Sequence, residues 1–465
     1  MENYLAFLEF EEKYQLFERK LLGVHYWQMV RTTFYELMRD SKYNLQESHP
    51  DTVNFQKKTF LLIKSLVINS FQKKNHYEKL QGKILLSVCA NSEENMVSEI
   101  VQYLNNDYCV LSRPSNGKHY FEENDVNIIF TDWIDLVRSI SIKCAQKFSV
   151  LKKGKCAQEL EYWLGAFEDE FNCKLPIGVM VNRLLHVIIT EKIVSFIFKK
   201  LFKANRPKKL VVVTHYDAFH FALIKVAHEL NIPVIELQHG YISSEHMAYN
   251  YMREHLLYFP DKILTFGDYW QSGLVYPRKE TFVSCGSVIG EKKYKYYYTN
   301  EERKYILFLS QGPYANMLYP LAVALYELIR TEGLEESYTI VYKLHPGEVE
   351  SWNKIHPTYN NKGIKLITEN GEDLYSLFNK SIMQVGVDST ALFEGLQFHI
   401  KTAVLSFTGM REDMKHLCEC GYGTLAITAN DLFDLLVSDN KERYDYEIFW
   451  KNNAVENIIG EIYNI

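Results

Sequence analysis

Two turns in the second half of the chain carry side chains that could bind a phosphate. Residues 341–346 read Val-Tyr-Lys-Leu-His-Pro, an apolar run that ends in His345 and Pro346. Residues 388–390, Asp-Ser-Thr, follow a second apolar run and precede a helical pattern. Carboxyl ends of parallel strands face the ligand crevice of an open α/β sheet, where free N–H groups at helix starts bind anions. The two turns therefore predict a cradle for a nucleotide mono- or diphosphate.

The residues of these turns have distinct predicted roles. His345 would donate to a phosphate oxygen and, as a cation, offset charge on a departing nucleotide, while Pro346 keeps the backbone from entering a helix at that point. Ser389 and Thr390 add hydroxyl donors. Glu394 lies one turn after Thr390 and would accept hydrogen bonds from ribose hydroxyls.

Four further residues complete the predicted cradle. Gln311 and Gly312 form the turn after the strand expected at residues 305–310, and a glycine there lets a nucleotide lie against the backbone. Lys343 is a weaker member, because its side chain alternates to the other side of the strand unless the strand bends. Asp388 opens the second turn, and the alternative for it is an ordinary helix N-cap.

Two turns in the first half of the chain carry candidate bases. His239 precedes Gly240 and follows the strand expected at residues 234–237. A neutral imidazole titrates near working pH, so His239 is the first candidate for a general base, and the alternative is a strand-end histidine bonded to nearby backbone. Asp217 is the second candidate, with capping of the helix expected at residues 218–230 as its alternative.

Parallel sheets must position these turns. Runs of Val, Ile and Leu without alternation indicate strands covered on both faces, and their alternation with helical patterns indicates βαβ units. We expect strands at residues 84–88, 126–130, 210–214, 234–237 and 263–266, and at residues 305–310, 338–344, 364–367, 382–387 and 402–405. Two doubly wound α/β domains facing each other across a cleft form the GT-B architecture, which is the predicted fold.

The same patterns predict five parts. They are a helical N-terminal extension (1–80), a Rossmann-like N-terminal acceptor domain (81–290), a linker (291–304), a Rossmann-like C-terminal nucleotide-donor domain (305–443) and a helical tail (444–465).

Composition excludes several classes of protein. The chain has 465 residues and a net charge of −6, which argues against nucleic-acid binding by phosphate neutralisation. Eight cysteines without a CxxC pair indicate neither a zinc ribbon nor a disulfide scaffold, so a reduced cytoplasmic setting is expected. No secretory signal pattern opens the chain. Residues 184–202 are apolar, but Glu191 and Lys192 lie near their centre, which predicts a buried or interfacial helix rather than a membrane span.

A lysine-flanked amphipathic segment at residues 57–71 could touch an anionic membrane face, with packing on the following domain as the alternative. We therefore expect a cytoplasmic protein with peripheral contact to the inner face of the membrane.

The chain also resembles a known family over about residues 205–405. The segments that carry the likeness are residues 206–213, 227–233, 238–240, 343–346 and 388–390. They are similar to the bacterial surface-polysaccharide transferases, including capsule and lipopolysaccharide sialyl- and Kdo-transferases and, more distantly, the CDP-glycerol glycerophosphotransferases. The resemblance implies donor-phosphate binding by His345, Ser389 and Thr390 and a catalytic role for His239. The aspartate-glycine base motif of several sialyltransferases has no clear counterpart, which argues against a sialic acid donor.

The expected function is a glycosyltransferase that moves a sugar from a nucleotide sugar to a glycan or lipid-linked glycan acceptor, with inversion. No DxD-like pair stands at a strand end, so neither a metal nor another cofactor is expected. The donor nucleotide (CMP, UDP or GDP) stays open. The alternatives are a nucleotide-sugar 2-epimerase, a glycerol- or ribitol-phosphate transferase that uses a CDP-alcohol, and a non-catalytic glycan-binding protein on the same scaffold.

Overall fold

A computed structural model of the chain forms two units. Contacts group Met1–Cys285 with Val455–Ile465 as unit 1, and Gly286–Ala454 as unit 2. The structure describes residues 3–42, 63, 66, 67, 76–89, 91–115, 118, 119, 127–345, 348, 349, 352, 363–368, 371–407, 412–438 and 445–464.

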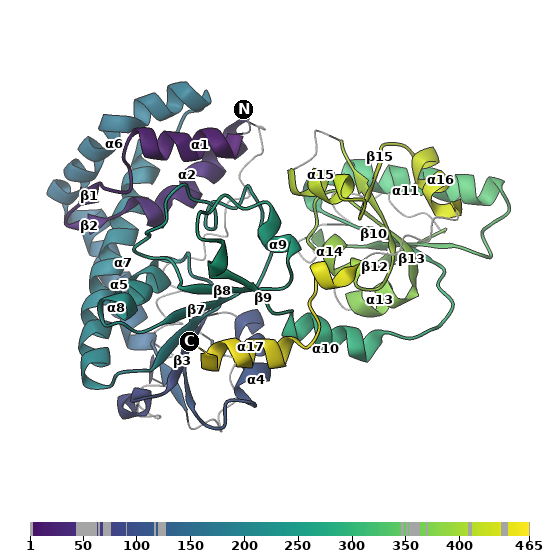
Figure 1. Cartoon of the computed structure of the whole chain (residues 1–465). Helices are drawn as coiled ribbons and strands as arrows, with labels where there is room; N and C mark the ends of the chain where they lie inside the picture. The colour runs from purple at the N-terminus through teal and green to yellow at the C-terminus, as the bar shows by residue number, and fades with distance from the viewer. Residues whose placement is uncertain are drawn as a thin grey trace. The chain divides into compact units, whose positions relative to one another are not determined.

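Unit 1 contains a seven-stranded parallel sheet (Figure 1). Its strands are β3 (Ile84–Val88), β4 (Tyr108–Ser112), β5 (Ile128–Phe130), β6 (Lys209–Val212), β7 (Val234–Leu237), β8 (Lys262–Thr265) and β9 (Phe282–Ser284). The order β5-β4-β3-β6-β7-β8-β9 is that of a doubly wound sheet, with its topological switch point between β3 and β6. Leu86 pairs with Val110 on one side and Val211 on the other, and β3, β4, β6 and β7 are buried along their whole length. Burial of both sheet faces explains the unbroken apolar runs in the sequence.

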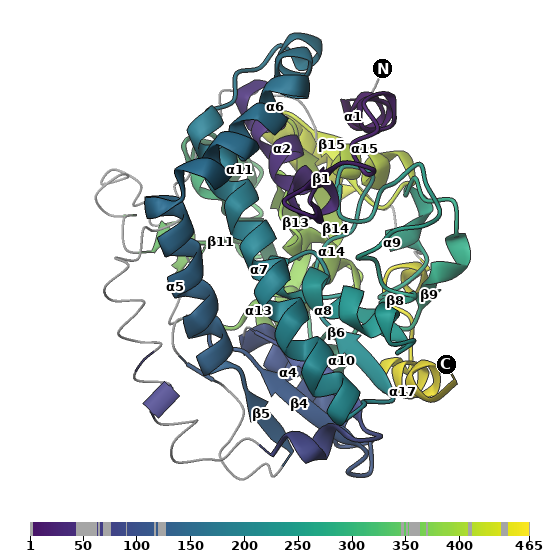
Figure 2. The same ribbon diagram turned by 90° about the vertical axis from the view of Figure 1, so that its left-hand side faces the viewer.

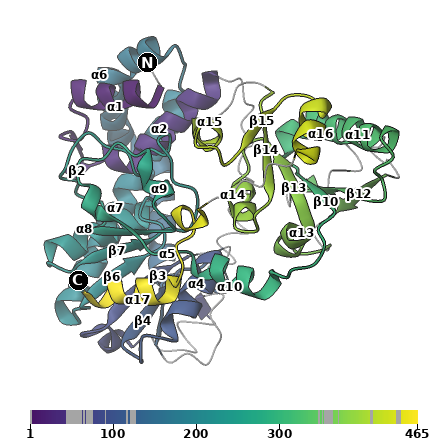
Figure 3. The same ribbon diagram turned by 45° about the vertical axis from the view of Figure 1, so that its right-hand side comes forward.

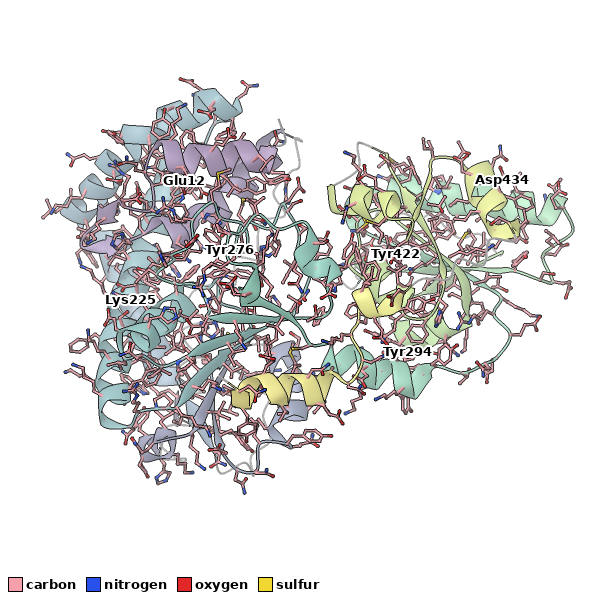
Figure 4. All side chains as sticks on the ribbon, viewed as in Figure 1. Glu12, Lys225, Tyr276, Tyr294, Tyr422 and Asp434 are labelled. Carbon is pink, nitrogen blue, oxygen red and sulfur yellow. The ribbon has the colours of Figure 1, made fainter. Side chains whose placement is uncertain are left out.

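Helices cover the sheet of unit 1. They are α4 (Asn91–Val101), α5 (Asp132–Phe148), α6 (Val150–Phe171), α7 (Ile177–Ala204), α8 (Ala218–Glu229), the short α9 (Tyr269–Ser272) and α17 (Ala454–Asn464). The long helix α7 packs against α5, α6 and α8 (Figure 2). Its Glu191 is buried and paired with Lys225 of α8 (Figure 4). The predicted buried helix at 184–202 is thus confirmed, and none of the helices in the described part of the chain is both long and apolar enough to cross a bilayer.

The N-terminal residues form a helical hairpin within unit 1, made of α1 (Asn3–Lys13), the two-stranded β1 (Lys20–Leu21) and β2 (Val24–His25), and α2 (Trp27–Lys42). Glu11 of α1 and Arg31 of α2 are almost fully buried, and the guanidinium donates from Nε and Nη2 to the two carboxylate oxygens at 2.6 Å each. Arg31 also donates from Nη1 to the carbonyl oxygen of Met247. Arg253 donates to Glu12 at 2.6 and 2.9 Å. The hairpin therefore holds the long loop between β7 and β8.

Unit 2 contains a six-stranded parallel sheet in the order β12-β11-β10-β13-β14-β15 (Figure 3). Its strands are β10 (Tyr305–Leu309), β11 (Thr339–Lys343), β12 (Ile364–Ile367), β13 (Ser381–Gly386), β14 (Lys401–Leu405) and β15 (Thr424–Ala426). Its helices are α10 (Val288–Tyr297), α11 (Ala315–Thr331), α13 (Leu374–Lys380), α14 (Ala391–Leu396), α15 (Glu412–Glu419) and α16 (Ala429–Val437). The strand order again reverses once, between β10 and β13, which is the switch point of this sheet.

The two parallel Rossmann-like sheets confirm the predicted fold class, and all ten expected strands are present. The expected linker is not irregular at its start, because α10 extends through Tyr297. The five-part division and the cleft stay predictions. Pro346 and most of the lysine-flanked segment at 57–71 lie outside the described residues.

We predict that Arg31→Met lowers the free energy of unfolding of unit 1 by about 3–5 kcal/mol, because it leaves the Glu11 carboxyl buried without its cation. Urea denaturation followed by tryptophan fluorescence measures this, since Trp27 lies in the same core and donates to Glu11. Arg253→Met is the matched control, whose pair is partly exposed and should contribute about 1 kcal/mol or less. Equal losses of unfolding free energy in the two variants would show that the buried Glu11–Arg31 pair contributes no more to stability than the partly exposed pair.

Candidate functional site

The switch point of unit 2 is closed by two polar side chains. Gln311 follows β10 and Asp388 follows β13, the neighbouring strand. The Gln311 side chain donates from Nε2 to the Asp388 carboxylate, and its Oε1 accepts the Asp388 backbone N–H at 3.2 Å. The N-cap position of α14 (Ala391–Leu396), which was the alternative role for Asp388, is taken by Thr390, and the Asp388 carboxylate bonds across the switch point. The pair fixes the ends of two strands at the place where open α/β sheets bind ligands.

A buried carboxylate that sequence reasoning missed holds the turn of His345. Glu348 Oε2 accepts the backbone N–H of His345 at 2.9 Å, and the Glu348 N–H donates to the His345 carbonyl at 2.9 Å. Glu348 Oε1 also accepts from the hydroxyl of Ser310 at 2.9 Å. Glutamate three residues after a turn residue is the spacing of a capping box, which is the signal that could have found it.

These contacts bring three of the predicted segments together. Ser310, Gln311 and Gly312 follow directly after β10, and a Cβ atom at Gly312 would lie 3.7 Å from Glu348 Cγ. The imidazole of His345 is exposed, and Lys343 donates from Nζ to the neighbouring Leu344 carbonyl at 3.3 Å. The turns after β10, β11 and β13 are thus joined by side-chain bonds, and a histidine ring projects from them into solvent.

The hydroxyls of the second turn differ in their surroundings. Ser389 Oγ accepts the backbone N–H of Ala391 at 3.3 Å, so part of its capacity is used within the turn. Thr390 is exposed at the N-cap position of α14, and its side chain makes no capping bond. The Thr390 hydroxyl is the one better placed to meet a ligand.

Glu394 points toward other helices of unit 2. Its side chain is hydrogen bonded to Tyr375 of α13, whose ring lies 4.3 Å from the Lys293 ammonium. Burial raises the pKa of Glu394, and the Tyr375 hydroxyl and the Lys293 charge oppose that rise. Burial together with the charge of Glu394 raises the pKa of Tyr375 as well, so the phenol stays protonated and donates. The predicted ribose contact of Glu394 stays a prediction.

In unit 1, a buried glutamine fixes the turn that carries His239. Gln238 donates from Nε2 to the Gly240 carbonyl at 2.7 Å, and its Oε1 accepts the backbone N–H of Phe266, just after β8, at 2.7 Å. The His239 ring is exposed, and its Nε2 lies 3.2 Å from the hydroxyl of Tyr216. Sequence reasoning named His239 but missed both side chains that place it.

Asp217 has the structural role that was its alternative. It is the N-cap of α8, where Oδ1 accepts the N–H groups of Phe219 at 2.7 Å and His220 at 3.1 Å. Oδ2 accepts from Arg113 Nη1 at 2.8 Å and lies 2.7 Å from His220 Nδ1. Burial alone would raise the pKa of Asp217, but the Arg113 and His220 charges hold it well below its usual range. A carboxylate so engaged is a poor base, and the catalytic role expected of Asp217 stays a prediction.

A buried pair behind this edge was also missed. His215 Nδ1 lies 2.6 Å from Glu236 Oε2, and His215 Nε2 lies 3.1 Å from the Ala248 carbonyl. Glu236 also accepts from the Tyr249 hydroxyl at 3.0 Å. Because a carbonyl only accepts, the contact with Ala248 requires a proton on His215 Nε2. A glutamate inside an apolar strand is the signal for such a partner.

In the part of the chain that the structure describes, no three or more His, Cys, Asp or Glu side chains lie so that they could hold a metal ion.

No family model and no curated protein matches the sequence. Among solved structures, the chain is similar to the UDP-GlcNAc 2-epimerase from Methanocaldococcus jannaschii, with a TM-score of 0.50 and 13% identity over 82% of this chain and 99% of that one. A putative UDP-N-acetylglucosamine 2-epimerase from Listeria monocytogenes has a TM-score of 0.49 and 13% identity, and the match covers 82% of this chain and 96% of that one. MurG from Acinetobacter baumannii has a TM-score of 0.45 and 12% identity, and the match covers 82% of this chain and 100% of that one.

The chain has a GT-B-like fold. At 13% identity the likeness extends to the fold and not to the reaction.

We predict that Asp217→Asn lowers stability at neutral pH and that the loss shrinks as pH falls below 3.8. The folded pKa lies below the ordinary value of 3.8, so the stability that the carboxylate contributes is complete above pH 3.8 and is lost as pH falls through the folded pKa. Asn keeps the cap, so the loss at pH 7 should be about 1.5 kcal/mol, the low end for a charged hydrogen bond, because the side chain is 35% exposed.

Thermal unfolding from pH 7 to pH 3 measures the effect of Asp217→Asn. Asp373→Asn is the control, because Asp373 caps α13 through the N–H of Tyr375 and Asn can replace it. A loss that stays constant over this pH range would mean that the charge on Asp217 is not what stabilises the fold.

Proposed function

We propose that this protein is a glycosyltransferase that takes a sugar from a nucleotide donor and transfers it, with inversion and without a metal, to a glycan or lipid-linked glycan at the bacterial surface. One observation carries the proposal. The Gln311–Asp388 bond and the Glu348 carboxylate tie the turns after β10, β11 and β13 together at the switch point of unit 2, where doubly wound sheets bind nucleotides.

The proposed role of unit 2 is to hold the nucleotide phosphate as it leaves. The exposed His345 imidazole donates to a phosphate oxygen and, when protonated, offsets the charge that develops there. Lys343 adds a cation in the same turn, and the Thr390 and Ser389 hydroxyls add neutral donors. These donors supply the electrostatic stabilisation that a metal provides in other transferases.

The proposed role of His239 is to take the proton of the acceptor hydroxyl. Burial, followed by the charge of Glu236, raises the pKa of Tyr216, so its hydroxyl stays neutral and bonds to the imidazole. When Tyr216 accepts the Nε2–H of His239, the Nδ1 lone pair is free to act as the base. The hydroxyl then also stabilises the imidazolium that forms.

The resemblance to surface-polysaccharide transferases supports a surface glycan as the acceptor. The same resemblance also allows a CDP-alcohol as the donor. A UDP-sugar is one of three donor types to compare, beside the CMP and GDP types.

A 2-epimerase is the second candidate, because the solved structure with a TM-score of 0.50 is a UDP-GlcNAc 2-epimerase. The turn after β13 reads Asp-Ser-Thr-Ala in place of the Ser-Gly-Gly run expected of those enzymes, which favours the transferase.

We predict that one of CMP, CDP, UDP and GDP raises the melting temperature of the protein and that His345→Gln weakens this nucleotide about 10- to 100-fold, through loss of a charge-assisted hydrogen bond. At 100 times its dissociation constant, a nucleotide adds about 2.7 kcal/mol to the folded state. Thermal shift titrations measure both effects, and His416→Gln in α15 of the same unit is the matched control. A panel without any shift, or equal affinities in the two variants, would contradict the nucleotide cradle.

We predict that incubation with a nucleotide sugar alone leaves the sugar configuration unchanged, because transfer requires an acceptor hydroxyl. Proton NMR of the anomeric and C2 signals follows the reaction. Conversion to the 2-epimer without acceptor would assign the second candidate function instead.

A further inference from the structure

The connection between α5 and α6 exposes three large apolar side chains to solvent. Phe148 is 71% exposed, Val150 82% and Leu151 73%. They lie next to one another in the sequence, on either side of the single connecting residue Ser149. We name these three side chains the α5–α6 tip. Adjacent exposed apolar residues of this size mark an interaction site more often than an ordinary surface.

The apolar surface continues along α5. Val137 is 44% and Ile140 49% exposed. Steps of three and eight residues from Val137 through Ile140 to Phe148 keep these side chains on one face of the helix. The opposite face is packed, since Ile142 and Ala145 belong to the core of unit 1.

The backbone of the tip is held firmly. Ser149 donates its N–H to the Ala145 carbonyl at 3.1 Å, and its carbonyl accepts the N–H of Lys153 at 3.1 Å. Cys156 and Leu160 of α6 are fully buried in the same core as α5. Figure 2 shows α5 beside α7, with α6 following it. The exposed tip therefore connects two helices that both pack on α7.

A basic sequence surrounds the tip. The chain has no Asp or Glu between Asp135 and Glu159. Within that stretch are five lysines: Lys143, Lys147, Lys152, Lys153 and Lys155. All are exposed except Lys153, which is half-buried. This local excess of positive charge stands out in a chain whose net charge is −6.

We propose that the α5–α6 tip binds the surface of an anionic phospholipid bilayer. Phe148, Val150 and Leu151 enter the boundary between headgroups and acyl chains, while the lysines beside them meet the anionic headgroups. Stable peripheral membrane binding combines apolar insertion with attraction of lysines to anionic headgroups, because each of these two contributions alone is weak. The surface is separate from every residue assigned to the nucleotide site, so the inference stands independently of the proposed function.

Vesicle sedimentation with the full-length protein tests the proposal. Wild-type protein should bind vesicles of phosphatidylcholine mixed with phosphatidylglycerol, bind phosphatidylcholine alone far more weakly, and dissociate as sodium chloride is raised. Lys152→Gln with Lys153→Gln should weaken binding about fivefold for each lysine. Phe148→Ser with Leu151→Ser should weaken it by roughly tenfold or more.

A matched control removes exposed apolar side chains elsewhere. Leu425→Ser with Ile427→Ser changes residues of unit 2 that are 45% and 60% exposed, and it should bind mixed vesicles as the wild type does. The lysine variant keeps the test valid if the Phe148 variant fails to fold, as judged by its melting temperature. The proposal is overturned if wild-type protein ignores mixed vesicles, binds both vesicles equally, or binds as well after the tip or lysine substitutions. An equal loss in the control variant also overturns it.

Discussion

The end of a parallel sheet is the constraint on which both candidate sites depend. Strands diverge there, ladder hydrogen bonds stop, and each backbone group that stays buried needs another partner. In this protein side chains supply those partners. Gln238 bonds the Phe266 N–H and the Gly240 carbonyl in unit 1, while Gln311 bonds the Asp388 N–H in unit 2. The turns that would meet a ligand are therefore rigid before any ligand arrives, which is the preorganisation that electrostatic catalysis needs.

At the same sheet edges, some polar side chains are engaged in holding the turns, and others are exposed. The carboxylate oxygens of Asp217 and Glu348 accept hydrogen bonds from backbone N–H groups and neighbouring side chains. His239 and His345, by contrast, are exposed. Gln238 fixes the turn that carries His239, and Glu348 fixes the turn that carries His345. A charged residue at the carboxyl end of a strand is thus not by itself a catalytic candidate. Its hydrogen-bond partners decide, because a carboxylate with four donors around it has little affinity left for a proton.

The sequence predicted the strands well because burial of both sheet faces leaves an unmistakable apolar run. In the two parallel sheets it missed β4 (Tyr108–Ser112), β9 (Phe282–Ser284) and β15 (Thr424–Ala426), of which β9 and β15 have only three residues each. It read the Lys- and Tyr-rich residues of α10 as a linker, although Ser287 caps that helix by accepting the Gly290 N–H. The site residues on turns could be named from motifs. Their partners could not, since Tyr216 and His239 or Gln311 and Asp388 meet only after the strands are placed side by side.

Both ends of the chain belong to unit 1. At the N-terminus, the buried Arg31 joins α2 to Glu11 of α1 and to the Met247 carbonyl, which lies in the loop that starts directly after the His239 turn. At the other end, Asn457 of α17 donates to the Cys285 carbonyl at 3.0 Å, and Lys262 pairs with Glu461 at 2.6 Å. The amino-terminal hairpin therefore packs within unit 1. It is the support of the loop that follows the candidate base, so a change more than 200 residues away in sequence acts on the surroundings of His239.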